Sequence, residues 1–512
     1  MDLVVTGTAV TLDEDRRVEP HAAIYLHDGR IEAVQPVRRR RPAGFARAPL
    51  VSTGGIITPG LMDLHSHLAY NSLPLWVAPK TTPYQTRYQW PGAVTYGRDI
   101  SNPAQALGIA AAAATLRYAE VKAIVGGVTA IQGSPPLTRA FPGWMVRNVE
   151  KDPVGGRDTV RQSVLKVESD RLDSYAEAMG QGRSFFYHLA EGTAPTLRSE
   201  YRDLAAHGCT GPGLIGIHST ALVDADYDDW SPPGAVVWSP FSNIWLYGGT
   251  TDILAARERG QLVCLGSDWA PSGTRSLLWE LKVADLWNRE ELGGALSDRD
   301  LVEFTTRNPG LAMERAWHVP VGRIVEGGLA DLTVHRARDT DPYRSLITAC
   351  EPDIRLVIVG GRPAYGLVSQ LTASGATDIE PIIVAGRRRG IVMTLPDELL
   401  PESPAQQREA TMSWAEGLAE LMHVSADPAA AVREARLPVR GGERLRFIPD
   451  MPVAVRADGE EESRALDDDE LAVLVVPEPE PLATDKAWLD FVASAAPAHA
   501  RILAKLGAYY SH

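Results

Sequence analysis

The sequence predicts an α/β protein built around a (β/α)8 barrel, and three observations lead to this prediction. The length of 512 residues corresponds to two to four ordinary domains. Between residues 58 and 318, short apolar runs alternate with helical stretches, as parallel βα units require. This stretch is also close to the roughly 250 residues of a (β/α)8 barrel. A doubly wound open sheet is the competing layout, although no glycine-rich fingerprint follows the first strand.

The two segments that flank the barrel are predicted to be β-rich. Residues 1–57 include the alternating run LVVTGTAVTL and a hairpin signal at Asp28-Gly29. Strands return over residues 319–370, in GRIVEGGLADLTVHR and IRLVIVGGRPAYG. We therefore expect the two flanks to pair in one small β-domain. Residues 371–512 are predicted to be an α+β extension of unknown role, with helices around residues 406–422 and 486–509.

Within the barrel segment, each apolar run and each helical stretch is assigned in chain order. Helices are expected in AQALGIAAAAATLRYAEVKAIV, SDRLDSYAEAMGQG, TTDILAARERG and RSLLWELKVADLW. Strands are expected in TAIQG, SFFYHLAEG, GLIGIHST, GAVVWSP and LVCLGSDWA.

Composition excludes several classes of function. The chain has 51 basic and 65 acidic residues and a net charge of −14, so neither nucleic acid nor an anionic membrane is an expected partner. Its three cysteines form no C-x-x-C pair, which excludes a disulfide scaffold and a cysteine-rich zinc module. The N-terminal segment does not read as a secretion signal, and no apolar run reaches the roughly 20 residues that span a bilayer. We expect a cytoplasmic protein.

The strongest pointer to chemistry is TPGLMDLHSHLAYN, which contains His65 and His67. Two residues apart on a strand, both imidazoles face the same side and can reach one metal ion. Alone this H-x-H pattern is weak, because the chain has 12 histidines.

Three further strand ends strengthen this interpretation. His188 ends the run SFFYH and Glu191 follows it, His218 ends LIGIH, and Asp268 ends LVCLGSD. In a (β/α)8 barrel, residues at the carboxyl ends of the strands converge on one mouth. Each residue alone also fits a plain structural role, the histidines in the core and Asp268 as a helix N-cap. Jointly they favour a catalytic site.

These motifs resemble the amidohydrolase superfamily. The phrases PGLMDLHSH, HLAEG, GIHS and GSD are most similar to the one-metal branch that contains S-adenosylhomocysteine, guanine and cytosine deaminases and the triazine hydrolases. Further support comes from GGVTAIQG, SPFSNIWLYG, TRNPG and GRIVEGGLADLTV. The resemblance covers residues 1 to about 366 and implies that the β-rich flanks form a small β-sandwich domain.

The resemblance also implies roles for the strand-end residues. It makes His65, His67, His188 and Asp268 the ligands of one divalent metal, Glu191 the proton shuttle, and His218 the group that orients and helps deprotonate water. Asp268 is then both ligand and proton acceptor. Three neutral imidazoles and one carboxylate leave the ion positive overall, which lowers the pKa of water. Zinc is expected first, with Fe²⁺ or Mn²⁺ as alternatives.

A two-metal site is the competing arrangement. It needs a bridging carboxylate or a carbamylated lysine at the end of the fourth strand, where Lys166 stands in SVLKVES. We favour a plain structural role for Lys166, because in the resembling branch the glutamate of HLAEG performs the acid–base work.

The sequence says least about the substrate pocket. Trp238 and Trp269 replace the histidine and glycine common in the resembling deaminases, and with Trp76 and Trp90 they could wall a pocket for a flat ring. Arg147 could clamp a carboxylate or phosphate. Core packing of the tryptophans and a salt bridge of Arg147 are equally open.

We therefore expect a hydrolase of C–N bonds that deaminates an amidine-like carbon in a small heterocycle. One alternative is an enzyme that opens a cyclic amide or displaces another leaving group. A second is a catalytically silent barrel that only binds. The sequence leaves open whether the chain forms homo-oligomers.

Overall fold

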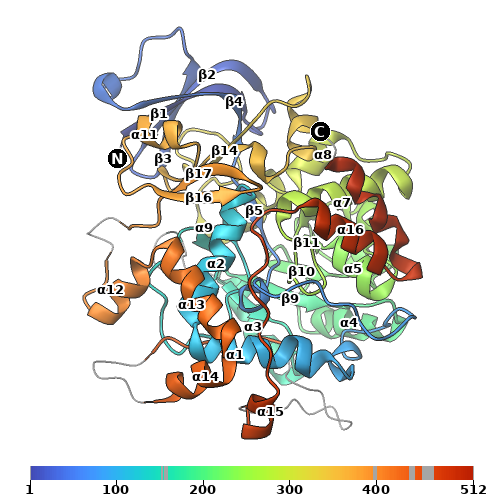
Figure 1. Cartoon of the computed structure of the whole chain (residues 1–512). Helices are drawn as coiled ribbons and strands as arrows, with labels where there is room; N and C mark the ends of the chain where they lie inside the picture. Colours follow the sequence, from blue (N-terminus) through green and yellow to red (C-terminus); the bar gives the residue numbers. More distant parts are fainter. Residues whose placement is uncertain are drawn as a thin grey trace.

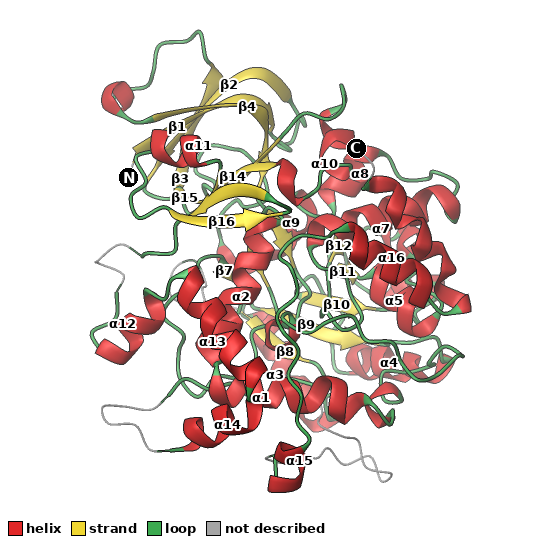
Figure 2. Cartoon of the chain, viewed as in Figure 1, coloured by secondary structure: helices red, strands yellow, loops and turns green. Residues whose placement is uncertain are grey.

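The computed structural model describes residues 2–150, 154, 160–395, 400–437, 444–451 and 466–510. Figures 1 and 2 show one large sheet beside a second region, in which helices surround shorter strands. Among the helices of these described residues, none combines the length and apolar character that crossing a membrane demands.

The large sheet has nine strands in the order β16-β17-β15-β14-β13-β4-β1-β2-β3. Neighbouring strands are antiparallel except β1 and β4, which are parallel. The strands are β1 (Asp2–Val10), β2 (Val18–His27), β3 (Arg30–Pro36), β4 (Leu50–Pro59), β13 (Leu332–His335), β14 (Ile354–Val359), β15 (Arg362–Gly366), β16 (Glu380–Val384) and β17 (Arg387–Ile391). The predicted hairpin joins β2 to β3: Asp28 and Gly29 have φ of 43° and 78°, as a two-residue turn of this kind requires.

The two flanks of the chain meet in this sheet, because β4 pairs with β13. The nine strands of the flanks form one continuous sheet rather than two separate ones, since the ten-residue strand β4 has a partner on each edge. Strands β16 and β17 extend the sheet beyond residue 370, where the sequence placed the start of a separate extension.

Eight shorter strands are all parallel and follow one another in chain order. One sheet contains β5 (Leu61–Asp63), β6 (Val128–Ile131) and β7 (Arg147–Asn148). The other contains β8 (Val160–Ser163), β9 (Ser184–Leu189), β10 (Leu214–His218), β11 (Ala235–Trp238) and β12 (Leu262–Leu265). Strands β6 and β9–β12 occupy the predicted apolar runs and are almost wholly buried, as parallel strands covered on both faces are.

The two parallel sheets touch at one pair of edges. Ser66, just after β5, forms a parallel bridge with Asp268, just after β12, and the Asp268 amide donates to the His65 carbonyl at 2.8 Å. The carboxyl ends of β5 and β12 therefore lie side by side, although about 200 residues separate them in the chain.

Helices cover the parallel strands (Figure 2). They are α1 (Asn102–Ala110), α2 (Ala112–Val125), α3 (Ser169–Gly180), α4 (Arg198–Ala206), α5 (Pro240–Tyr247), α6 (Ile253–Glu258), α7 (Leu277–Glu290), α8 (Asp298–Glu303) and α9 (Arg307–Trp317), while α10 (Pro342–Ile347) packs against α7 and α8, and α11 (Val368–Ala373) packs against the large sheet. The four predicted helices are confirmed. The first is broken in two at Ala111, whose φ of −143° and ψ of 40° are not helical.

The C-terminal extension wraps around the helices of the parallel-strand region. It contains α12 (Pro404–Ala410), α13 (Trp414–Ala426), α14 (Pro428–Arg436), α15 (Asp468–Ala472), α16 (Lys486–Ala495) and a 3-10 helix, η9 (Ala498–Tyr509). Figure 1 shows α13 and α14 beside α1 and α2, and α16 beside α5 and α7. Aromatic pairs fasten both contacts: Trp414 stacks on Tyr118 and Trp488 on Phe241, with centroids 6.0 and 5.8 Å apart.

Candidate metal centre and active site

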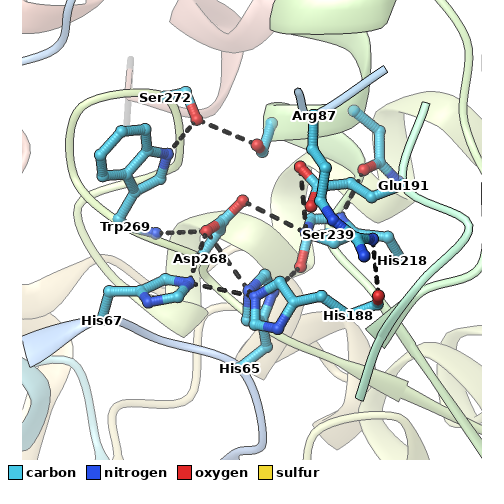
Figure 3. Close-up of polar contacts among 12 residues, drawn as sticks. His65, His67, Arg87, His188, Glu191, His218, Ser239, Asp268, Trp269 and Ser272 are labelled. Atoms are coloured by element: carbon cyan, nitrogen blue, oxygen red, sulfur yellow. Dashed lines mark hydrogen bonds and ion pairs between the residues drawn. The ribbon is translucent and has the colours of Figure 1, made fainter. Parts of the chain in front are cut away.

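Three imidazoles and one carboxylate from three strands converge at the carboxyl ends of β5, β9 and β12. His65 and His67 follow β5, His188 lies in β9, and Asp268 follows β12 (Figure 3). His188 Nε2 lies 3.2 Å from both His65 Nε2 and His67 Nε2. Asp268 Oδ1 lies 3.4 Å from His65 Nε2 and 3.7 Å from His67 Nε2. All four side chains are buried.

These spacings fit a divalent metal ion. Two zinc–nitrogen bonds of about 2.0–2.1 Å at a tetrahedral angle place the nitrogens about 3.3–3.4 Å apart. The opposite ring atoms are already engaged, His65 Nδ1 with Ser239 Oγ and His67 Nδ1 with Asp450 Oδ2, both at 2.7 Å. The Nε2 atoms therefore face one another, and a cation shared between them relieves the repulsion of their lone pairs.

Burial sets the protonation of these groups. Burial and the neighbouring imidazoles hold the pKa values of His65 and His188 well below their usual range, so both rings are neutral and able to bind a metal. Burial also acts to lower the pKa of His67, but the carboxylates of Asp450, Asp268 and Glu191 together outweigh it and raise that pKa to about 9. Metal binding at His67 therefore displaces a proton.

Glu191 and His218 lie beside this cluster. His218 Nε2 is 3.7 Å from Glu191 Oε1 and 3.8 Å from Asp268 Oδ2. His218 Nδ1 is bound to Asn243 Oδ1 at 2.8 Å, and Glu191 Oε1 accepts a hydrogen bond from the Tyr247 hydroxyl at 2.5 Å. Glu191 Oε2 and His218 Nε2 are buried and have no hydrogen-bond partner among the described residues. Two proton-transfer atoms are thus held next to the cluster and left available.

The backbone at the strand ends is unusual. Ala190, His218 and Asp268 have positive φ values of 48°, 61° and 59°, which residues with a side chain rarely adopt. Gly133, after β6, has a φ of 106°, and a Cβ there would lie 1.7 Å from the Ser66 carbonyl oxygen. Left-handed turns and a close backbone approach are therefore built into the rim that carries the cluster.

Three of the four predicted pocket tryptophans join the site. Trp76, Tyr96, Trp90 and Trp269 form a chain of ring contacts with centroids 5.1–6.4 Å apart. The chain reaches the metal cluster at His67, whose ring lies 6.4 Å from that of Trp269. Trp238 is outside this chain, among the described ring contacts. Its indole donates to Thr250 Oγ1 at 2.6 Å, and Thr250 also accepts from Asn243.

Two further residues considered from the sequence, Arg147 and Lys166, have acidic partners in the structure. Arg147, considered as a substrate clamp, pairs with Asp331, with Nε 2.7 Å from Oδ2, so Asp331 already engages its guanidinium. Lys166, the candidate for a second metal, is 47% exposed and lies 3.4 Å from Asp203 Oδ2. Among the His, Cys, Asp and Glu side chains of the described chain, two groups could hold a metal ion: His65, His67 and His188, and His65, His218 and Asp268.

Besides Ser239, four residues that support the site were not singled out from the sequence. Asp63 accepts hydrogen bonds from the amides of His65 and Ser267, and Arg87 donates to the His188 carbonyl oxygen at 2.6 Å. Tyr247 holds Glu191 and Asp450 holds His67. Asp63 lies inside PGLMDLHSH and Tyr247 inside SPFSNIWLYG, so the motifs could have indicated them. Arg87 and Asp450 lie in no recognised pattern.

The comparisons with known proteins agree with this arrangement. A 5-methylthioadenosine/S-adenosylhomocysteine deaminase of Syntrophobacter fumaroxidans is 27% identical over 406 residues, which cover 70% of this chain and 92% of that protein. The structure of a zinc-bound adenosine deaminase from Xanthomonas campestris matches 71% of this chain and 92% of its own, with a TM-score of 0.54 and 17% identity. No family model matches the chain.

A triazine hydrolase from Arthobacter aurescens is similar in fold as well. It matches 71% of this chain and 94% of its own, with a TM-score of 0.53 and 17% identity. At these identities the solved structures establish a shared fold, while the deaminase sequence match spans most of both chains. With the converging histidines and Asp268, these similarities in sequence and fold agree with the resemblance to the amidohydrolase superfamily that the sequence motifs carry.

Proposed function

We propose that this chain is a metal-dependent hydrolase of C–N bonds that deaminates an amidine-like carbon in a small heterocycle. The observation that carries the proposal is the meeting of three imidazole Nε2 atoms and the Asp268 carboxylate at 3.2–3.7 Å, beside the available Glu191 and His218. The names of its relatives, deaminases of adenosine-type compounds and a triazine hydrolase, support a heterocyclic substrate.

The proposed metal ligands are His65, His67, His188 and Asp268, with zinc favoured and Fe²⁺ or Mn²⁺ as alternatives. A zinc-bound structural neighbour supports zinc. A divalent ion there supplies Lewis acidity, which lowers the pKa of water toward about 7 in the case of zinc.

The proton transfers are proposed for residues of the chain itself. Glu191, fixed through Oε1 by Tyr247, offers Oε2 to carry the two protons that the attacking water loses, the first to the ring nitrogen next to the attacked carbon and the second to the departing amine; protons taken up by His218 or Asp268 pass to Glu191, which lies beside His218. His218, fixed through Nδ1 by Asn243, keeps Nε2 toward Glu191 and Asp268, where it takes a proton from the attacking water. Asp268 is the second acceptor for that proton.

The aromatic chain is the proposed wall of the substrate pocket. Trp90 and Trp269, with centroids 5.1 Å apart, stand next to His67 and present flat apolar surface to a flat ring. Trp76 extends this surface through Tyr96. Trp238 is proposed to act indirectly: its indole holds Thr250, which in turn binds Asn243.

We also propose that strands β5–β12 close into a (β/α)8 barrel within residues 58–318. The strand order supports closure, as does the Ser66–Asp268 bridge at one junction of the two sheets. At the other junction, the side chain of Gln132, after β6, donates to Gln162 of β8 at 3.1 Å. In this division, residues 1–57 and 319–370 form the β-domain, to which β16 and β17 add two strands, and the rest of 371–512 is the extension. A small molecule is the proposed partner.

Substitution Glu191→Gln tests the proposed proton shuttle. The amide cannot carry the transferred proton, so kcat for ammonia release should fall by roughly 10²–10⁴-fold while zinc content stays at that of the wild type. Glu177→Gln, the same chemical change on the exposed face of α3, is the matched control. Wild-type turnover by Glu191→Gln would refute the role.

Product analysis distinguishes the rival functions. Amino-substituted purines, pyrimidines and triazines are the probes, and release of one ammonia per turnover supports deamination. Release of a different group, or ring opening without ammonia, would show that the chain is a hydrolase that catalyses a reaction other than deamination. Purified protein with well under one equivalent of metal, and no turnover after zinc is added, would favour a silent binding barrel.

A further inference from the structure

A short piece of the C-terminal extension, residues 444–451, contacts helix α1 and the loop after β6. The Phe447 amide donates to the Gly108 carbonyl oxygen at 3.2 Å, and the Ile448 amide to that of Pro136 at 3.0 Å. Leu137 and Phe447 form an antiparallel bridge. A Cβ at Gly108 would lie 2.5 Å from the Phe447 carbonyl oxygen, so the fit is close. Backbone contacts therefore fix the position of this piece.

The piece brings Asp450 against a proposed metal ligand. Asp450 Oδ2 lies 2.7 Å from His67 Nδ1, and the next amide, that of Met451, donates to the Tyr70 hydroxyl at 3.2 Å. The Asp450 side chain is only 12% exposed. Its Oδ1 has no hydrogen-bond partner among the described residues. A buried carboxylate with so few partners costs stability, which favours a role beyond holding the fold together.

Asp450 differs from the groups that hold the other imidazoles. His65 Nδ1 contacts the hydroxyl of Ser239, and His218 Nδ1 contacts the amide oxygen of Asn243, both near the start of α5. Of these three Nδ1 atoms, that of His67 is the one held by a carboxylate, and Asp450 lies 383 positions away in the chain. Because an acceptor at Nδ1 keeps the proton there, Nε2 is left with its lone pair toward His188 and Asp268.

We propose that Asp450 is a positioning residue of the metal centre, through which the C-terminal extension completes the active site. Its carboxylate fixes the ring orientation and tautomer of His67 and strengthens Nε2 as a donor. Outer partners of metal-bound histidines typically contribute 10–100-fold to metal affinity or activity. The inference rests on the proposed function, since it takes His67 as a ligand.

Zinc affinity of the full chain, measured by competition with a chromophoric chelator, tests this inference without a substrate. Asp450→Ala should weaken zinc binding by about 10–100-fold, and Asp450→Asn by less, because the amide oxygen still accepts from Nδ1. At saturating zinc, Asp450→Ala should still have a lower activity than the wild type. The decrease should appear in kcat rather than in KM, since His67 would be misoriented.

Glu480→Gln is the matched control. Glu480 is another carboxylate of the extension, 14% exposed, and it binds Arg275 through two contacts of 3.0 Å without touching the metal cluster. Its variant should keep wild-type zinc affinity. Suppose that the wild type binds zinc and releases ammonia, and that the zinc affinity of Asp450→Ala lies within twofold of the wild-type affinity. The role of Asp450 is then refuted, while the proposed function stands. If the wild type binds no zinc, the proposed function fails with it.

Discussion

At the scale of single residues, the site depends on neighbouring side chains that hydrogen-bond to the reactive side chains and hold them in place. Glu191, His65, His67 and His218 each have one atom occupied by a neighbour and another left toward the cluster. A side chain fixed in this way loses little freedom when it reacts, and preorganisation of this kind lowers the barrier of the chemical step.

Tyr247→Phe tests this principle at Glu191. The substitution removes the hydroxyl that donates to Glu191 Oε1 at 2.5 Å and accepts from the Trp90 indole at 3.0 Å, and leaves the ring in place. We expect kcat to fall by about 10-fold with unchanged zinc content. Tyr227→Phe is the control, because that buried hydroxyl has no hydrogen-bond partner among the described residues. Equal rates for the two variants would contradict the assignment.

At the scale of elements, the nine-stranded sheet contains a buried titratable group. His335 ends β13, where it pairs with residues of β4 and β14, and its ring is fully buried. Burial lowers its pKa to about 4, against the weaker opposing effect of a hydrogen bond with the Arg336 carbonyl oxygen. The sheet that unites the two flanks therefore requires a neutral imidazole.

The stability of the chain should depend on pH through this histidine. Between the folded pKa of about 4 and the ordinary value of 6.5, the unfolded state binds more protons. The neutral His335 ring therefore contributes fully to the free energy of unfolding above about pH 6.5. As the pH falls toward 4, this contribution decreases by on the order of 2–3 kcal/mol. Urea unfolding at pH 7 and pH 4.5 measures it. Between these two pH values, the free energy of unfolding of His335→Gln should fall by less than that of the wild type. His21→Gln, a substitution on an exposed part of β2, should show the same fall as the wild type.

At the scale of the whole molecule, the metal centre ties together distant parts of the chain. The proposed ligands come from β5, β9 and the turn after β12, and Asp450 adds the C-terminal extension. Aromatic stacking and the Arg275–Glu480 ion pair hold the extension on both sides. A cation bound at this point stabilises only the arrangement in which all of these segments are in place.

Removal of the metal should therefore lower the melting temperature. At zinc a hundredfold above its Kd, binding contributes about 2.7 kcal/mol, which corresponds to several degrees. Chelator-treated protein should melt lower than the same protein with zinc restored, in calorimetry at constant protein concentration. His188→Ala, which lacks one ligand, should no longer respond to zinc. An unchanged wild-type melting temperature after chelation would exclude a zinc site at this position.

Local pattern was enough to predict much of this protein. Strands with alternating or continuous apolar residues, the Asp28-Gly29 hairpin and the four helices follow from neighbouring residues, as does the placing of His65, His188, His218 and Asp268 at strand ends. Because parallel strands carry their carboxyl ends to one side, these residues could be expected to meet. The resemblance to the amidohydrolase superfamily came from the same motifs.

Only the tertiary structure decided which side chains complete the site. Arg147 matched a substrate clamp in the sequence but binds Asp331, and Trp238 faces Thr250 rather than the aromatic chain. Asp450 reaches His67 from 383 residues away, in a segment without a motif. Sequence patterns report periodicity and spacing along the chain, whereas a contact between distant segments depends on how their elements pack. That packing, and with it the contact of Asp450 with His67, exists only in the folded molecule.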